Sequence, residues 1–154
     1  MTPPPARPAK QRKLDTLHRL EHDEDLWVAT AGTDGGAPYL VPLSFLWDGE
    51  TLLLATPAAS PTGRNLRATG TVRIGLGPTR DVVMVDGTVE ALTPDALRAG
   101  EGDRFAARTG FDPRELTTEY LYFRVRPRRV QAWREANELA GRELMRDGTW
   151  LIAD

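Results

Sequence analysis

The sequence predicts a mainly β protein, an antiparallel barrel with short flanking helices. Apolar residues recur at period two along residues 39–47, and a second apolar strand over 51–56 follows the turn Asp48-Gly49. An earlier strand over 26–33 is joined to the first through Asp34-Gly35-Gly36, so two hairpins follow one another. Successive hairpins with further strands behind them favour an antiparallel barrel over alternating βα units.

Length and composition narrow the class of protein. The 154 residues suit about one domain, which can bury about two-thirds of its unfolded surface and needs no disulfide or metal to fold. Cysteine is absent, which excludes disulfides, thiol catalysis and thiolate metal sites and favours the cytoplasm. The net charge of −2 argues against a general nucleic-acid binder, and no apolar run approaches the ~18 residues of a membrane span.

The N-terminal residues predict a tail followed by a helix. Residues 1–13 are rich in proline and basic side chains and poor in apolar ones, which predicts a disordered tail ahead of a single domain over 14–154. Leucines at helical spacing then indicate a short helix. His18 and His22 lie four residues apart on it and could share a metal, but no third ligand is evident, so we predict surface histidines and no metal site.

A loop of small and hydroxylated residues over 57–66 runs into a short helix that ends at Gly70. Thr62 is the predicted N-cap, which leaves backbone N–H groups free at the helix start. Such groups suit a phosphate, together with the hydroxyls of Ser60 and Thr62 and the guanidinium of Arg64. The alternatives are a solvent-facing Arg64 and ordinary loop and cap roles for the two hydroxyls.

The rest of the chain predicts more strands and short helices. Gly87, inside a strand expected over 81–92, indicates a bulge or a tight bend. Thr93-Pro94-Asp95 starts a helix expected to reach Arg108. Further elements are expected as follows: a strand over 72–76, a short helix from Asp112-Pro113, strands over 120–126 and 128–135, and a solvated helical face with Arg134, Glu138 and Arg142.

The sequence resembles the flavin-binding split-barrel superfamily, which includes pyridoxamine-phosphate-oxidase-like proteins and deazaflavin (F420)-dependent reductases. The segments GGAPYLVPLSFLWDGETLLLAT, SPTGRNLRATGTVRIGLG and DVVMVDGTVE carry the resemblance, which covers roughly residues 26–134. It implies an antiparallel split β-barrel of the FMN-binding type, paired as a homodimer, with each cofactor in a cleft between the two subunits.

The resemblance also implies an activity. The cofactor would be FMN, or alternatively F420, with hydride transfer between its ring and a small organic substrate. A non-catalytic flavin-, F420- or tetrapyrrole-binding carrier or sensor is the alternative. Arg124, Arg126, Arg128 and Arg129 form a basic patch that is solvated, binds the acidic tail of F420, or holds a second anionic group. Pyridoxamine-phosphate oxidation proper would require that patch.

The resemblance further implies which residues contact the cofactor. The ring would lie on the strands at 39–44 and 55–56, and the phosphate at the hydroxyl-rich loop. The implied cofactor-binding residues are Tyr39, Val41, Pro42, Leu43, Ser44, Ala55, Thr56, Ser60, Thr62, Arg64, Asn65 and Trp150. Val41 and Leu43 could instead be barrel core, and Asn65 could tie the helix to the barrel. Trp150 would cover the partner's cofactor. No catalytic side chain is assigned; a solvent proton or Tyr39 would complete a reduction.

Overall fold

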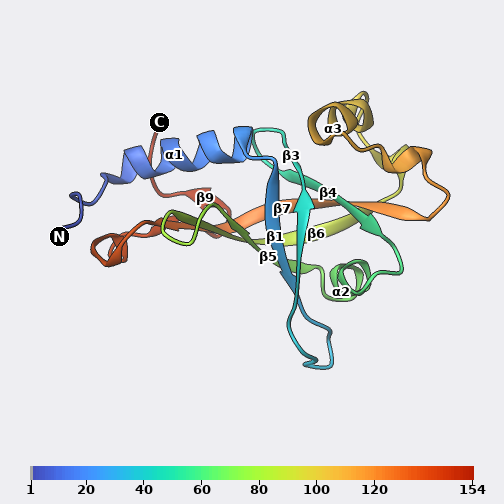
Figure 1. The fold of residues 1–154 in the computed structure, drawn as a ribbon, viewed down its shortest axis with the longest axis horizontal. Coiled ribbons are helices and arrows are strands. Elements are labelled where there is room, and N and C mark those ends of the chain that lie inside the picture. Colours follow the sequence, from blue (N-terminus) through green and yellow to red (C-terminus); the bar gives the residue numbers. More distant parts are fainter. Residues whose placement is uncertain (1) are drawn as a thin grey trace.

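The computed structural model of the chain describes residues 2–154 and shows a curved antiparallel sheet with three flanking α-helices (Figure 1). The described strands run in the order β2-β1-β5-β6-β7-β4-β3, with the hairpin β8–β9 attached to β7. The strands are β1 (Asp25–Thr30), β2 (Tyr39–Ser44), β3 (Leu46–Trp47), β4 (Leu52–Pro57), β5 (Thr71–Leu76), β6 (Val82–Leu92), β7 (Tyr120–Trp133), β8 (Glu143–Arg146) and β9 (Thr149–Trp150). The helices are α1 (Ala9–His22), α2 (Pro61–Thr69) and α3 (Glu101–Thr109). The predicted split-barrel fold is confirmed.

The sheet curves because its two longest strands bend together. Pairing of β6 with β7 shifts register at Asp86/Gly87, which confirms the predicted bulge. A Cβ on Gly87 would lie 2.7 Å from the carbonyl oxygen of Arg126, so only glycine fits there. Pro127 lies opposite Gly87, where the ladder is already interrupted and a missing N–H is tolerated. The two late strands predicted from the sequence are therefore one bent strand, β7.

The hairpins differ in part from the prediction. The first is confirmed, since β2 pairs along its length with β1. The strand does not continue to Trp47, however, because the chain breaks at Phe45, whose side chain is 1% exposed and turns into the core. Only Leu46 and Trp47 pair with β4, which otherwise pairs with β7. Burial of one large aromatic side chain thus ends the expected second hairpin after two residue pairs.

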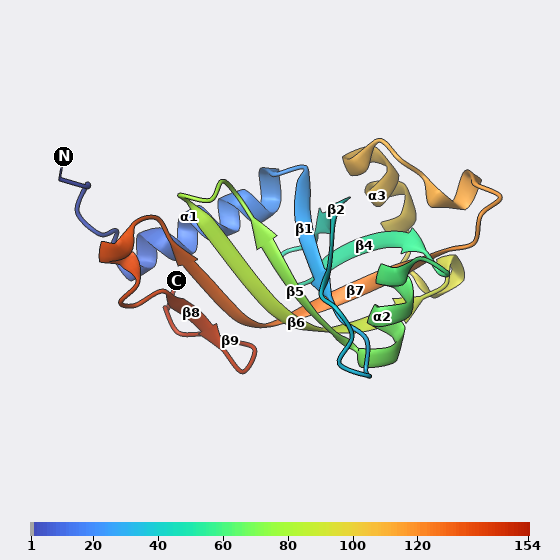
Figure 2. The same ribbon diagram turned by 60° about the horizontal axis from the view of Figure 1, so that its bottom comes forward.

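The core lies on the concave side of the sheet, and alternate residues of its strands enter it. Val28 of β1, Ile74 of β5 and Val85 of β6 are fully buried, as period-two alternation predicts. Leu66 of α2 joins them and fixes that helix against the sheet. Figure 2 shows α1 and α2 at separate places along the curved sheet. None of the helices described in residues 2–154 is long and apolar enough to cross a membrane.

The connection between β6 and β7 is less helical than expected. The helix predicted from Thr93 to Arg108 is split: a 3-10 turn covers Pro94–Ala96, and α3 starts only after Gly100, whose φ is +74°. Glycine adopts this left-handed conformation without the steric cost that other residues incur. The helix predicted at Asp112-Pro113 is a 3-10 turn, Pro113–Glu115. The Asp112 carboxylate accepts a hydrogen bond from the backbone N–H of Arg114 and caps that turn.

The N-terminal segment differs from the expected disordered tail. Helix α1 begins at Ala9, and the side chains of Arg12 and Lys13 are buried. The Arg12 guanidinium donates to the carbonyl oxygens of Ala132 and Glu138, 3.2 and 2.8 Å away. Arg12, which the sequence places in a disordered tail, thus satisfies carbonyl groups at the end of β7 and in the segment that follows it.

Glu138 is also corrected. It lies in a 3-10 turn, Ala136–Glu138, and not on the predicted solvated helix. Its side chain is 3% exposed and accepts from the Arg7 guanidinium at 2.8 and 3.0 Å and from the backbone N–H groups of Arg7 and Arg134. These hydrogen bonds lower the pKa of Glu138 to about 2, against the penalty of burial.

This carboxylate makes stability depend on pH. Because its folded pKa lies below the ordinary value, its contribution is present above about pH 4.5 and is lost as pH falls towards 2. The contribution corresponds to about 3 kcal/mol. Replacing Glu138 with glutamine should remove this contribution, so the free energy of unfolding of Glu138→Gln should vary less with pH than that of wild type. Urea unfolding between pH 2 and 7 measures both. An unchanged pH profile in Glu138→Gln would contradict the assignment.

Candidate functional site

A groove of about 360 Å³ runs between β2 and β4 and is called here the β2–β4 groove. Pro42, Leu43 and Ser44 line it from β2, and Ala55 and Thr56 line it from β4. These five residues were all predicted to bind the cofactor. They converge although β2 and β4 are not paired, because the break at Phe45 turns the chain back across the sheet.

Aromatic side chains from the β6–β7 connection form the other wall. Phe105 of α3 and Phe111 line the groove with Tyr120 of β7, and the rings of Phe111 and Tyr120 are 5.5 Å apart between centroids. The Asp25 carboxylate lies at the same groove and accepts a 2.7 Å hydrogen bond from the Ser44 hydroxyl. The groove therefore offers apolar surface for a flat ring, with a few polar groups that could fix its orientation.

The start of α2 is capped differently from the prediction. Ser60, not Thr62, is the N-cap: its hydroxyl accepts from Gly63 N–H at 3.0 Å and donates to the Pro57 carbonyl at 2.8 Å. The same hydroxyl lies 3.3 Å from that of Thr56, which links the cap to the β2–β4 groove. Pro61 carries no N–H, and Arg64 N–H is bonded to the Ser60 carbonyl. Fewer N–H groups are therefore free for a phosphate than the sequence predicted.

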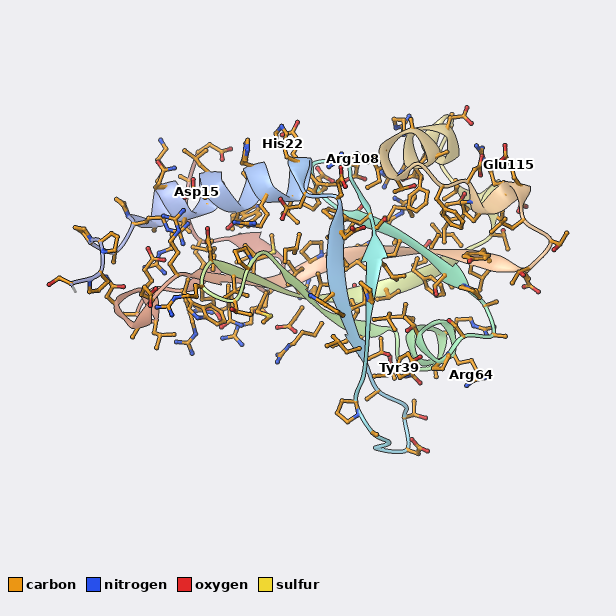
Figure 3. All side chains as sticks on the ribbon, in the orientation of Figure 1. Asp15, His22, Tyr39, Arg64, Arg108 and Glu115 are labelled. Carbon is orange, nitrogen blue, oxygen red and sulfur yellow. The ribbon has the colours of Figure 1, made fainter. Side chains whose placement is uncertain are left out.

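Thr62 and Arg64 have opposite surroundings. Thr62 is 2% exposed, so its side chain is shielded from any ligand at the surface. Arg64 is exposed, and its side chain extends outward from α2, at the same end of the molecule as Tyr39 (Figure 3). One Arg64 nitrogen donates to the Ala59 carbonyl at 3.0 Å, and no described carboxylate pairs with it. Its other donors are available to a phosphate.

The remaining predicted residues lie outside the groove. Asn65 donates to the Thr30 hydroxyl at 3.1 Å and so ties α2 to β1, in agreement with its alternative role. Tyr39 is partly exposed at the start of β2, and Val41 packs against the core. Trp150 packs on the core of its own chain with the Lys13 ammonium 5.3 Å from its ring centre. None of these four residues lines the β2–β4 groove.

The predicted basic patch is divided in the structure. Arg124 is 4% exposed and is bonded through two nitrogens to the Glu101 carboxylate, each at 2.7 Å. Arg129 pairs with Glu143 of β8 at 2.7 Å. Of these four arginines, only Arg126 and Arg128 form no ion pair with another residue among 2–154. Four adjacent arginines therefore do not present one continuous anion-binding surface.

Other functional expectations can be placed as well. His18 and His22 stack at 4.1 Å, and His22 Nδ1 lies 2.8 Å from the His18 carbonyl. No group of three or more metal-binding side chains occurs within residues 2–154. The sequence did not identify Asp25, Phe105, Phe111 or Tyr120 as site residues, because only the tertiary fold brings these distant segments to β2 and β4.

Comparison with known proteins assigns the chain to a family. The sequence model described as pyridoxamine 5'-phosphate oxidase matches residues 17–134. The chain belongs to this family. The resemblance to pyridoxamine-phosphate-oxidase-like split barrels inferred from the sequence is thereby confirmed. No protein of curated function matches the chain.

Solved structures of other proteins show the same fold. An F420 reductase is 24% identical, with a TM-score of 0.59, and the match covers 73% of this chain and 93% of the reductase. An FAD-binding protein from Mesorhizobium loti is 21% identical, with a TM-score of 0.61 and coverage of 77% and 89%. General Stress Protein 26 from Bacillus anthracis is 17% identical, with a TM-score of 0.56 and coverage of 82% and 95%.

Proposed function

We propose that the protein binds a flavin-type cofactor, FMN or alternatively F420, in the β2–β4 groove and transfers hydride between it and a small organic substrate. One observation carries this proposal: the fold gathers Pro42, Leu43, Ser44, Ala55 and Thr56 around a single groove beside the start of α2. The names of the F420 reductase and of the FAD-binding protein support a cofactor of this type.

The chain's contribution would be to bind and orient. Apolar surface from β2 and β4 would support the ring, and the bound cofactor would supply the redox chemistry. Phe111 and Tyr120 would keep water from the ring. The exposed guanidinium of Arg64 would hold the phosphate, because it retains unused donors and can contact two oxygens at once. Ser60 would support this contact indirectly, since its hydroxyl already fixes the loop.

Replacing Arg64 with alanine should weaken binding of FMN and F420 at least about tenfold, through loss of a charge-assisted contact. Fluorescence titration measures the dissociation constant of each cofactor. Arg67→Ala is the matched control: it removes an equal charge from the same helix, yet its side chain is occupied by the carbonyls of Ala58 and Gly63. Equal affinity of wild type and Arg64→Ala for both cofactors would disprove the phosphate assignment.

A non-catalytic carrier or sensor is the second candidate. It is favoured by the side chains of the groove, which include no histidine and one carboxylate, Asp25, already bonded to Ser44. Tyr39, the candidate proton donor, does not line the groove. Mixing the loaded protein with NAD(P)H or reduced F420 and an acceptor separates the two: oxidation of the reduced cofactor supports the enzyme, and a stable chromophore without turnover supports the carrier.

We further propose that the protein is a homodimer through the convex side of β1, β2 and β5. Trp27 and Leu40 are 51% and 59% exposed there, beside a shallow apolar hollow that Met84 also lines. Exposed apolar patches of this kind mark protein interfaces. Leu40→Glu should convert the dimer to a monomer in analytical ultracentrifugation, because it places a charge in the buried patch. A monomeric wild type at micromolar concentration would contradict this assignment.

A further inference from the structure

A second groove, of about 330 Å³, lies where β3, the bend of β7 and the hairpin β8–β9 meet, and is called here the two-tryptophan groove. Trp47 and Trp150 line it together with Pro127 and Met145. Both indoles pack partly on the core, so they are held in place while part of each remains accessible. The proposed cofactor role does not use this groove, because it shares no lining residue with the β2–β4 groove.

Two opposite charges complete the lining. Arg126 and Glu50 are both exposed at this groove, and neither side chain forms an ion pair or a hydrogen bond within the described residues. Most other arginines near β7 are occupied, as in the pairs Arg124–Glu101 and Arg129–Glu143. Arg126 and Glu50 are thus a cation and an anion that the fold leaves available on the border of an aromatic surface.

The geometry points to a binding site for a small aromatic zwitterion of amino-acid size. Indole faces favour a flat ring, a guanidinium favours a carboxylate, and the Glu50 carboxylate favours an ammonium group. The volume lies at the low end of the roughly 300–1,000 Å³ of small-molecule sites, which excludes large ligands. A single-charged aromatic compound would leave Arg126 or Glu50 without a partner, so the zwitterion is favoured over either ion.

The site can be tested with three matched probes. L-Phenylalanine carries both charges, phenylacetate only the carboxylate, and phenethylamine only the ammonium group. Heteronuclear NMR of the ¹⁵N-labelled full chain resolves the indole N–H of each of its 4 tryptophans. L-Phenylalanine should shift the Trp47 and Trp150 signals saturably, with a dissociation constant of about 1 mM or below, and leave Trp27 and Trp133 unchanged. Tryptophan-to-phenylalanine variants assign the four signals.

Charge variants then test the two polar contacts separately. Arg126→Ala should weaken L-phenylalanine and phenylacetate about tenfold and leave phenethylamine unchanged, whereas Glu50→Gln should show the reverse selectivity. Arg80→Ala, which removes an exposed charge outside the groove, should change none of the three affinities.

Several results would overturn the proposal. These are the absence of saturable shifts with L-phenylalanine, equal shifts of all four indole signals, or an Arg126→Ala variant that binds L-phenylalanine like wild type. The experiment requires neither FMN nor F420, so its outcome is independent of the proposed oxidoreductase function.

Discussion

Arg124→Ala should lower the free energy of unfolding by about 3–5 kcal/mol, because it breaks a buried ion pair and leaves one partner behind. The side chains of Arg124 and Glu101 are 4% and 2% exposed and bonded through two nitrogens. Removing the arginine leaves the Glu101 carboxylate buried without its cation. Because α3 carries both Glu101 and Phe105, the wall of the β2–β4 groove should loosen with it, and affinity for the cofactor should fall.

The pH dependence of this variant identifies the cause. The hydrogen bonds from Arg124 lower the pKa of Glu101 in the native protein. Without them burial raises that pKa, so the carboxyl becomes neutral on mild acidification and the deficit relative to wild type should shrink as pH falls. Arg73→Ala breaks an exposed pair with Asp86 and should cost at most about 1 kcal/mol. Similar losses in Arg124→Ala and Arg73→Ala would contradict the role of burial.

Gly63→Ala should lower both the stability of the protein and its affinity for the cofactor. Helix propensity alone predicts that alanine stabilises α2 by about 1 kcal/mol. The structure predicts the opposite sign: a Cβ on Gly63 would collide with the carbonyl oxygen of Pro57 and lie 3.0 Å from that of Ala58. Backbone carbonyls cannot yield as a side chain can, so α2 must shift from the loop, at a cost of about 1–3 kcal/mol.

That shift should also reach the proposed phosphate site. Gly63 N–H is the donor that the Ser60 hydroxyl caps, and Arg64 is the next residue. We expect FMN affinity to fall at least about tenfold in Gly63→Ala, as for Arg64→Ala. Gly36→Ala is the control, since the nearest atom to its Cβ is the movable Asp34 carboxylate, at 3.1 Å. Urea unfolding and flavin titration measure both effects; a stabilised variant with unchanged affinity would contradict the predicted clash.

Local periodicity allowed much of the sheet to be predicted. β5 and β6 alternate between buried and outward residues, and Gly87 marks a bulge that glycine alone can occupy, so each carries its own signal in the sequence. The partner of β4 was harder to predict, because a turn at Asp48-Gly49 favours pairing with the whole strand before it. Only Leu46 and Trp47 pair with β4, which otherwise pairs with β7, and this depends on burial of Phe45, which only the complete core determines.

The residues of the candidate site that lie within the family motif could be predicted, whereas those from other segments of the chain could not. Residues 42–44 and 55–56 carry the family motif, and the fold does bring them together. Ser60 and Thr62 are both plausible caps by type, and the presence of Pro61 at the first helical position makes Ser60 the cap. The charges of Arg7, Arg12 and Lys13 were read as a solvated tail, because their partners lie more than a hundred residues away.

Titration of the purified wild-type protein with FMN and with F420, followed by visible absorption and fluorescence, tests the central claim most directly. We expect saturable binding of at least one of them, with one cofactor per subunit and a perturbed ring spectrum, because the ring moves from water to the apolar β2–β4 groove. A protein that binds neither cofactor, or whose bound cofactor keeps the spectrum it has in water, would contradict the account.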